Sequence, residues 1–387
     1  MGEVDLEAVR ACLGRRGQQP GPVEVGAALR SLGLLVSDSV VRQTVAALRR
    51  DSVGAGVLDP LLQLPGVTDV LVNAPDRVYI DRGHGLEPAG VRFSSEEEVR
   101  RLAVRLAASV GRRLDDGSPF VDARLANGVR VHAVLPCVAE SGTCLSLRVP
   151  NRHRMSLADW VAAGSLSPRG MDLLAALVAA RRAFLVSGGT GSGKTTLLGA
   201  LLGLVPPAER IVIVEDSREL QPHHPHCVRL EGRPANAEHS GAVTLTDLVR
   251  QALRMRPDRL VVGEVRGAEL ADLLSALNTG HEGGCGTVHA NSAADVPPRL
   301  EALAALGGLG RDALHAQLAA ALKVLLQVRR LPDGRRWLEE MRLVKVDPAS
   351  GRCLTVPAIR FRPAAGPDGE AVPGEGYAEL ERLVASC

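Results

Sequence analysis

The spacing of hydrophobic and polar positions changes along the chain. Over residues 1–60, apolar residues recur at helical intervals, as at Val41, Val45 and Leu48, which predicts a small helical appendage. From residue 61 to residue 150, short runs rich in β-branched residues surround one amphipathic helical stretch. Strands mixed with a helix in this way predict a smaller α+β domain.

A regular alternation of strands and helices is predicted from residue 171 to residue 345. Its strands are almost continuously apolar, as expected when both faces of a parallel sheet are covered by helices. In such a sheet, ligands bind beyond the carboxyl ends of the strands. Polar candidates lie at four of these ends: Ser187, Glu215, Glu264 and His289.

Two further segments lack this regularity. Residues 151–170 contain a short helical stretch at 157–161, interrupted by Gly164, Pro168 and Gly170, and we predict a linker there. Residues 346–387 are predicted to form a C-terminal tail, in which the Pro/Gly-rich stretch 363–376 is loose.

A glycine-rich loop joins the strand that ends at Ser187 to the next predicted helix. The loop and helix start read Gly188-Gly189-Thr190-Gly191-Ser192-Gly193-Lys194-Thr195-Thr196. This motif, between a strand and a helix, is typical of a phosphate-binding loop, because successive backbone N–H groups and the helix N-terminus converge on one anion. Lys194 is expected to reach the β- and γ-phosphates, and the Thr195 hydroxyl to hold Mg²⁺. The alternative is a plain strand-to-helix turn.

Two glutamates are the candidate acidic groups. Glu264 follows the apolar run 260–263 and is a candidate general base or water-orienting group, although Gly263 stands where an Asp is usual. Glu215 ends a neighbouring strand and could anchor Mg²⁺, partly through water. The alternatives are a surface glutamate for Glu264 and pairing with arginines on a solvated turn for Glu215.

The candidate histidines and arginines indicate a nucleotide site less specifically than the glycine-rich loop does. His281 and His289 flank a Gly-rich turn and could hydrogen-bond the γ-phosphate, or each could be structural. Arg130 and Arg148 lie on predicted neighbouring strands, and an arginine from another domain or subunit can neutralise charge in phosphoryl transfer. Surface solvation is the simpler interpretation of both. The cluster of His223, His224, His226 and Cys227 matches no closed zinc site.

Composition narrows the functional classes. The chain has 387 residues, of which 45% are hydrophobic, and a net charge of +2, which indicates a globular protein. Aromatic residues make up only 2%, so neither a basic groove nor a stacking platform for nucleic acid is expected. No apolar run reaches the ~20 residues of a membrane span, and the acidic start is unlike a signal peptide. We therefore expect a cytoplasmic protein with unpaired cysteines.

Five motifs in order carry a resemblance to a known family. They are the loop at 188–195, the acidic run 213–220, the run 252–259, the run 263–267, and the segment 278–291. Upstream, residues 72–73, 111–115, 119–124 and 128–133 fit as well. Together they resemble the type II/type IV secretion ATPases, specifically the CpaF/TadA-type branch of tight-adherence pilus assembly.

The resemblance implies a RecA-like P-loop C-terminal domain behind a smaller α/β N-terminal domain, assembled as a homo-hexamer. It implies an ATPase that uses Mg²⁺, with a Walker A loop at 188–195, an Asp box at Glu215, a Walker B at Glu264 and a His box at His281 and His289. It also implies that Arg130 and Arg148 reach the nucleotide phosphates. ATP turnover would drive an inner-membrane platform from its cytoplasmic face.

Two other functions stay open. One is a conjugative-type secretion motor or a RecA-like motor that moves nucleic acid. The other is a nucleotide-gated regulatory subunit with little turnover, which the presence of Lys194, Thr195 and Glu264 disfavours.

Overall fold

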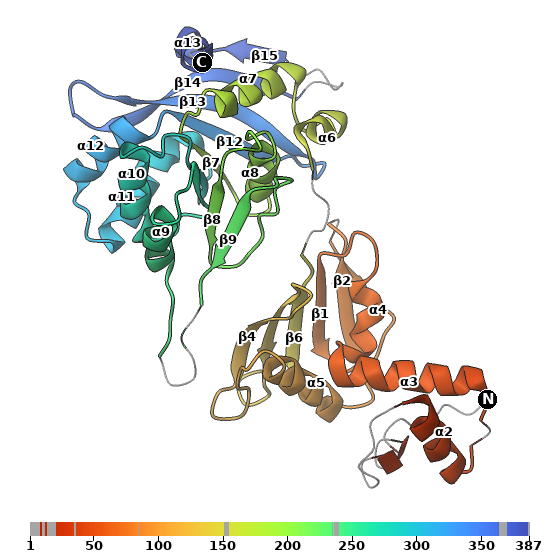
Figure 1. Ribbon diagram of the computed structural model, residues 1–387. Coiled ribbons are helices and arrows are strands. Elements are labelled where there is room, and N and C mark those ends of the chain that lie inside the picture. The colour runs from red at the N-terminus through yellow and green to blue at the C-terminus, as the bar shows by residue number, and fades with distance from the viewer. Residues whose placement is uncertain are drawn as a thin grey trace. The chain divides into compact units, whose positions relative to one another are not determined.

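The computed structural model describes residues 8–9, 12–13, 21–34, 36–83, 85–150, 155–233, 235, 240–363 and 370–385. The chain divides into two compact units, Met1–Asn151 and Arg152–Cys387 (Figure 1). Each unit has its own sheet and its own core. We describe them one at a time.

The first unit begins with helices. Pro22 opens α2 (Pro22–Ser31) at a position where its missing N–H is not needed. α2 and α3 (Asp38–Val53) share a small core that includes Val25, Leu29 and Leu48. The short η1 (Gly56–Leu58) and α4 (Asp59–Leu62) instead contribute to the core of the following sheet. The helical appendage therefore ends before residue 55 rather than at residue 60.

A six-stranded antiparallel sheet forms the rest of this unit, in the order β3-β2-β1-β6-β5-β4. Its strands are β1 (Asp69–Ala74), β2 (Arg77–Asp81), β3 (Leu86–Pro88), β4 (Phe120–Arg124), β5 (Arg130–Val134) and β6 (Cys144–Arg148). Buried and accessible residues alternate along β4, β5 and β6, as expected for a sheet with one covered face. α5 (Glu96–Ala108) begins where the Ser95 side chain accepts a hydrogen bond from the Glu98 N–H, and it packs on that face (Figure 1).

The second unit is built on a nine-stranded sheet in the order β15-β14-β13-β12-β7-β11-β10-β8-β9. The strands from β12 to β9 in this order are parallel, and β13, β14 and β15 extend the sheet antiparallel. Their bounds are β7 (Phe184–Gly188), β8 (Ile211–Glu215), β9 (Cys227–Glu231), β10 (Arg259–Val262), β11 (Cys285–His289), β12 (Val324–Arg330), β13 (Arg336–Val346), β14 (Cys353–Arg362) and β15 (Glu370–Pro373). Every residue of β7, β8 and β10 is buried, which explains their continuous apolar sequence.

Helices cover both faces of this sheet (Figure 1). One core joins it to α6 (Leu157–Ala162), α7 (Pro168–Ala179), α8 (Lys194–Leu202) and α13 (Tyr377–Ala385). The other core joins it to α9 (Leu245–Leu253), α10 (Glu269–Asn278), α11 (Val296–Leu306) and α12 (Arg311–Ala321). The 3-10 turn η2 (Ala293–Asp295) leads into α11.

The predicted linker over 151–170 is wrong in its described part. Ser156 caps α6 through a capping box with Asp159, and Trp160 on this helix is only 1% exposed in the core. Pro168, interpreted as a break, is the first residue of α7, with Ser167 as its N-cap. Both signals mark helix starts rather than interruptions. Residues 151–154 lie outside the described residues.

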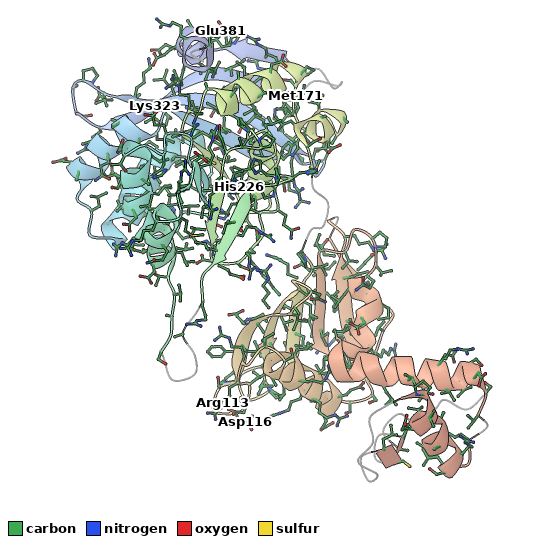
Figure 2. The ribbon with its side chains drawn as sticks, in the orientation of Figure 1. Arg113, Asp116, Met171, His226, Lys323 and Glu381 are labelled. Atoms are coloured by element: carbon green, nitrogen blue, oxygen red, sulfur yellow. The ribbon has the colours of Figure 1, made fainter. Side chains whose placement is uncertain are left out.

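The prediction that the stretch 363–376 is loose is contradicted at residues 370–373, which form β15, and the described residues around it also belong to the second unit. β14 pairs along most of its length with β13, and β15 pairs with β14. The Trp337 indole donates to the Phe361 carbonyl at 2.9 Å, and Phe361 and Leu380 are buried in the core. Arg169 on α7 donates to Glu381 at 2.7 Å. Figure 2 labels Glu381 on α13. These strands bury their apolar positions against one end of the sheet, so the segment is part of the domain. Residues 364–369 lie outside the described residues.

Five of the described strands were not predicted, namely β3, β9, β12, β14 and β15. β9 follows a loop of Pro and His residues, and its residues are only partly buried, so its apolar pattern is weak. β12 begins three residues after the end of α12. Among the described helices, none is both long and apolar enough to cross a membrane.

Candidate functional site

The glycine-rich loop connects the carboxyl end of β7 to the start of α8. Gly193 has φ of 98°, a left-handed conformation that favours glycine. A Cβ there would lie 2.7 Å from Arg336 Cδ and 3.3 Å from a carbon of the Trp160 ring. The backbone of the loop is therefore held between two large side chains, and only glycine fits.

Lys194 is folded back onto its own loop. Its Nζ donates to the carbonyls of Gly188 and Gly189 at 3.0 Å each, and lies 3.3 Å from His289 Nδ1. The side chain is 6% exposed, and burial lowers the pKa of its ammonium group. A phosphate at the loop would offer this buried cation a charged partner in place of neutral carbonyls.

Glu264 lies in a network that links three strand ends. One carboxylate oxygen is 3.1 Å from His289 Nε2, and the other accepts from Arg266 Nη2 at 2.7 Å. Burial raises the pKa of Glu264, but Arg266, His289 and Lys194 outweigh it, so the net pKa is lowered. Burial and the charge of Lys194 lower the pKa of His289. A neutral His289 can thus donate from Nε2 to an ionised Glu264 and accept from Lys194 at Nδ1.

Glu215 occupies the place that an aspartate at position 263 would fill. A Cβ on Gly263 would lie 2.5 Å from Glu215 Cγ, and Gly263 N–H donates to the Val214 carbonyl at 2.8 Å. Glycine at 263 is therefore required by the side chain from β8, which brings its own carboxylate to this point. The departure from the usual motif has a structural cause.

Only one of the two carboxylate oxygens of Glu215 accepts hydrogen bonds among the described residues. Oε1 accepts from the N–H groups of Glu219 and Leu220 at 3.0 Å each, whereas Oε2 is buried with no hydrogen-bond partner among the described residues. Burial raises the pKa of Glu215 to about 7. A buried carboxylate oxygen without a donor is the arrangement expected where a cation or an ordered water completes the site.

Replacing Gly263 with alanine is expected to destabilise the second unit by about 1–3 kcal/mol, because Glu215 must move and weaken its two hydrogen bonds. Both tryptophans of the chain, Trp160 and Trp337, lie in this unit and are buried, so their fluorescence in urea reports its unfolding. The control is Gly199→Ala on α8, where the new Cβ would lie 3.9 Å from its nearest neighbour. This control should raise stability by up to about 1 kcal/mol. Equal effects of the two variants would contradict the close fit at Gly263.

The residues present fit a magnesium-bound nucleoside triphosphate. The loop offers backbone N–H groups and the N-terminus of α8, and Lys194 supplies charge. Ser192 Oγ is buried and, among the described residues, has no hydrogen-bond partner. Thr195, half-buried in the first turn of α8, and Glu215 supply the oxygen atoms that Mg²⁺ prefers. The described residues contain no group of three or more His, Cys, Asp or Glu side chains that could hold a metal by itself.

His281 is not at this site. It precedes β11, whereas His289 ends it, so the two histidines lie at opposite ends of one strand. His281 Nδ1 is 3.0 Å from the Pro257 carbonyl, just before β10. Because β10 and β11 are parallel to β7, this is the sheet edge away from the phosphate loop. The prediction that His281 contacts the nucleotide rested on its place beside the Gly-rich turn and on the family's His box, and within one chain the structure places it away from the phosphate loop.

The acidic run after β8 is only partly buried. Glu215 is 4% exposed, but Asp216 and Glu219 are exposed on the following turn. Arg266 lies between the strands, with Nη1 at 3.5 Å from Asp216 and Nη2 on Glu264. Sequence reasoning gave Arg266 no role, although it lies two residues after Glu264 in an extended segment, where alternate side chains share a side.

In the first unit, Arg130 and Arg148 are direct cross-strand partners on β5 and β6. Arg124 on β4 is opposite Arg130 and extends the row, which the sequence reasoning did not include. Arg148 donates to Asp69 at 3.0 Å and is 66% exposed. The sheet thus presents a row of guanidinium groups on the face away from its core.

Comparisons with known proteins found a matching family model and similar sequences. A family model described as "Type II/IV secretion system protein" matches residues 51–350. A putative conjugal transfer protein of Mycobacterium tuberculosis is 57% identical over 328 residues, covering 83% of this chain and 93% of that protein. A probable conjugal transfer protein TrbB of Sinorhizobium fredii is 32% identical over 275 residues, covering 70% of this chain and 81% of that protein.

Among solved structures, the Legionella pneumophila ATPase DotB is similar in fold. The similarity has a TM-score of 0.51 with 19% identity and covers 80% of this chain and 81% of that one. The prediction of a RecA-like P-loop fold with a smaller N-terminal domain is confirmed.

Proposed function

Because the chain belongs to the type II/IV secretion system protein family, we propose that it is a motor that hydrolyses ATP to drive secretion or pilus assembly. The observation that carries the proposal is the network of Lys194, His289 and Glu264 beside the phosphate loop. It combines a phosphate-binding cation with an ionised carboxylate, which phosphoryl transfer to water requires.

Each residue of the site has a role in this proposal. The backbone of residues 188–193 and the Lys194 ammonium bind the β- and γ-phosphates, and Thr195 and Thr196 extend the contacts at the start of α8. Thr195, and Glu215 through water, would hold Mg²⁺ together with the nucleotide, and the ion would neutralise phosphate charge. Glu264 accepts the proton of the attacking water or orients it, and His289 holds Glu264 and Lys194 in place.

The finer assignment follows the sequence motifs. We propose a motor of the CpaF/TadA type for tight-adherence pilus assembly, acting as a homo-hexamer on a membrane platform at the cytoplasmic face. In the ring, Arg130 and Arg148 would bring positive charge to the phosphates of a nucleotide, either in their own subunit or in a neighbour.

Conjugal transfer is the second candidate. Its support is the names of two relatives, from Mycobacterium tuberculosis and Sinorhizobium fredii. Stimulation of ATP turnover by single-stranded or double-stranded DNA, lost steeply as salt rises, would favour this candidate. Turnover that is indifferent to DNA would favour secretion of protein or assembly of a pilus.

The first experiment measures mass by light scattering and phosphate release for the wild type and Lys194→Ala. With a non-hydrolysable ATP analogue, the wild type is expected to form a hexamer, and with ATP and Mg²⁺ to release phosphate. Lys194→Ala is expected to do neither, because the loop loses its cation. Absence of phosphate release in every oligomeric form of the wild type would contradict the motor and favour a nucleotide-gated regulatory subunit.

A further inference from the structure

The β12–β13 hairpin lies on the other side of the phosphate loop from Glu264. In the sheet order, β7 lies between β12 on one side and β11, followed by β10, on the other. Arg330 ends β12 and Arg336 begins β13, and the two residues are direct cross-strand partners. Because β12 is parallel to β7, both arginines lie at the sheet edge that carries the phosphate loop.

Both arginines approach the loop itself. The Arg336 stem lies so close to Gly193 that a Cβ there would be 2.7 Å from its Cδ. A Cβ on Gly191 would lie 4.0 Å from Arg330 Nη1. These glycines belong to the segment whose N–H groups would surround a phosphate, so the Arg336 stem and the Arg330 guanidinium group border the same site.

Some arginines of the β12–β13 hairpin have carboxylate partners, and Arg336 differs from them. Arg329 is paired with Glu339 at 3.3 Å, and Arg335 with Asp333 at 2.7 Å. For Arg336, the described part of the chain supplies no carboxylate partner, and the residue is half-buried. Burial and the charge of Arg330 lower the pKa of Arg336.

The position of Arg336 is unfavourable without an anion. A partly buried charge needs a counter-ion, and a like charge directly opposite on the neighbouring strand, here that of Arg330, destabilises a sheet. Arg336 also borders the phosphate-binding loop at Gly193. A ligand that brings negative charge to the loop would supply the carboxylate-like partner that Arg336 lacks among the described residues.

We propose that Arg336, with Arg330 beside it, binds the phosphate chain of the nucleotide held by residues 188–195. The inference rests on the proposed nucleotide-binding function and adds a second group of positively charged residues to the nucleotide site. The nucleotide would then be held between Lys194 and the acidic network on one side and an arginine hairpin on the other.

Nucleotide binding by the full-length chain, measured by titration calorimetry at fixed salt, tests this inference. Arg336→Met keeps an apolar stem against Gly193 and removes the charge. It is expected to weaken binding of ADP and of a non-hydrolysable ATP analogue by about 10- to 100-fold, as for a lost hydrogen bond to a charged group. Arg336→Lys is expected to lose less, because it keeps a point charge.

The matched control is Arg335→Gln, which removes the adjacent arginine that already has Asp333 as its partner. Its ADP affinity should stay within about twofold of the wild type. Urea unfolding of each free variant, followed by tryptophan fluorescence, separates a loss of contact from a loss of fold. If Arg336→Met does not fold, Arg336→Lys and Arg330→Gln decide the question through the same titration.

The outcomes are distinct. The inference is overturned if folded Arg336→Met binds ADP with wild-type affinity. If Arg336→Met does not fold, it is overturned if Arg336→Lys and Arg330→Gln both bind ADP with wild-type affinity. A loss that is as large for adenosine as for ADP would also overturn it, because the contact would then be to the base or ribose. If the wild type and Arg335→Gln themselves bind no nucleotide, the proposed function fails instead.

Discussion

Glu264→Gln is expected to lower the rate of ATP hydrolysis by about two to three orders of magnitude, the usual effect of losing a general base. Affinity for ATP should change by less than about threefold, because Lys194 and the loop backbone, not Glu264, contact the phosphates. Glutamine keeps the size and shape of the side chain, and its one amide oxygen can still accept from Arg266, while the NH2 group takes the place of the oxygen that faces His289. Phosphate release and ATP binding, measured on the same preparation, check both expectations.

A control variant separates catalysis from the loss of any acidic group. Glu282→Gln removes an exposed carboxylate in the turn before β11, at the sheet edge away from the loop. Its turnover should match the wild type. If Glu264→Gln hydrolyses ATP as fast as Glu282→Gln, then Glu264 is not the base, and the carboxylate of Glu215 becomes the next candidate.

The parts of this structure that were predictable from sequence are local. The buried strands of the second unit have continuous apolar sequences because both of their faces are covered. The phosphate loop is equally local, since the motif, its strand and its helix are contiguous. The direction of each strand then places Glu264 and His289 at the same edge as Lys194.

Contacts between residues that are far apart in the sequence could not be predicted in the same way. The fit of Glu215 against Gly263 depends on β8 and β10 being neighbours, which no short segment of sequence specifies. Arg259 is 1% exposed, and its guanidinium donates to Glu209 at 2.6 Å and to the Val178 carbonyl at 3.0 Å. Sequence alone would place such a residue at the surface, because its partners come from distant segments.

The errors have a common physical cause. Pro168 was interpreted as an interruption, although proline starts a helix when an apolar stripe follows. The stretch 363–376 was interpreted as loose because it is rich in Pro and Gly, and the strands before it were not predicted. Antiparallel pairing with β13 gives those strands their buried positions, and that pairing is visible only in three dimensions.

The unfolding free energy of the nucleotide-free protein should depend on pH through Glu215. Its folded-state pKa of about 7 lies above the 4.5 of an unperturbed glutamate, so the folded state holds the proton more tightly than the unfolded state. The wild type therefore loses stability as pH rises from 4.5 to 7, by about 3 kcal/mol in total. Glu215→Gln carries no such proton, so its stability relative to the wild type should increase by about 2–3 kcal/mol between pH 5 and pH 8.

The measurement is urea unfolding followed by the fluorescence of Trp160 and Trp337, both within the second unit. Glu264→Gln is the matched control. The pKa of Glu264 is lowered, so its contribution to stability changes only below the ordinary glutamate pKa of 4.5, and the difference from wild type should be flat from pH 5 to pH 8. Parallel pH profiles for wild type and Glu215→Gln would show that Glu215 is ionised in the free protein. Magnesium with ADP should flatten the wild-type profile, because a cation near Glu215 favours its ionised form and supplies the partner that Oε2 lacks among the described residues.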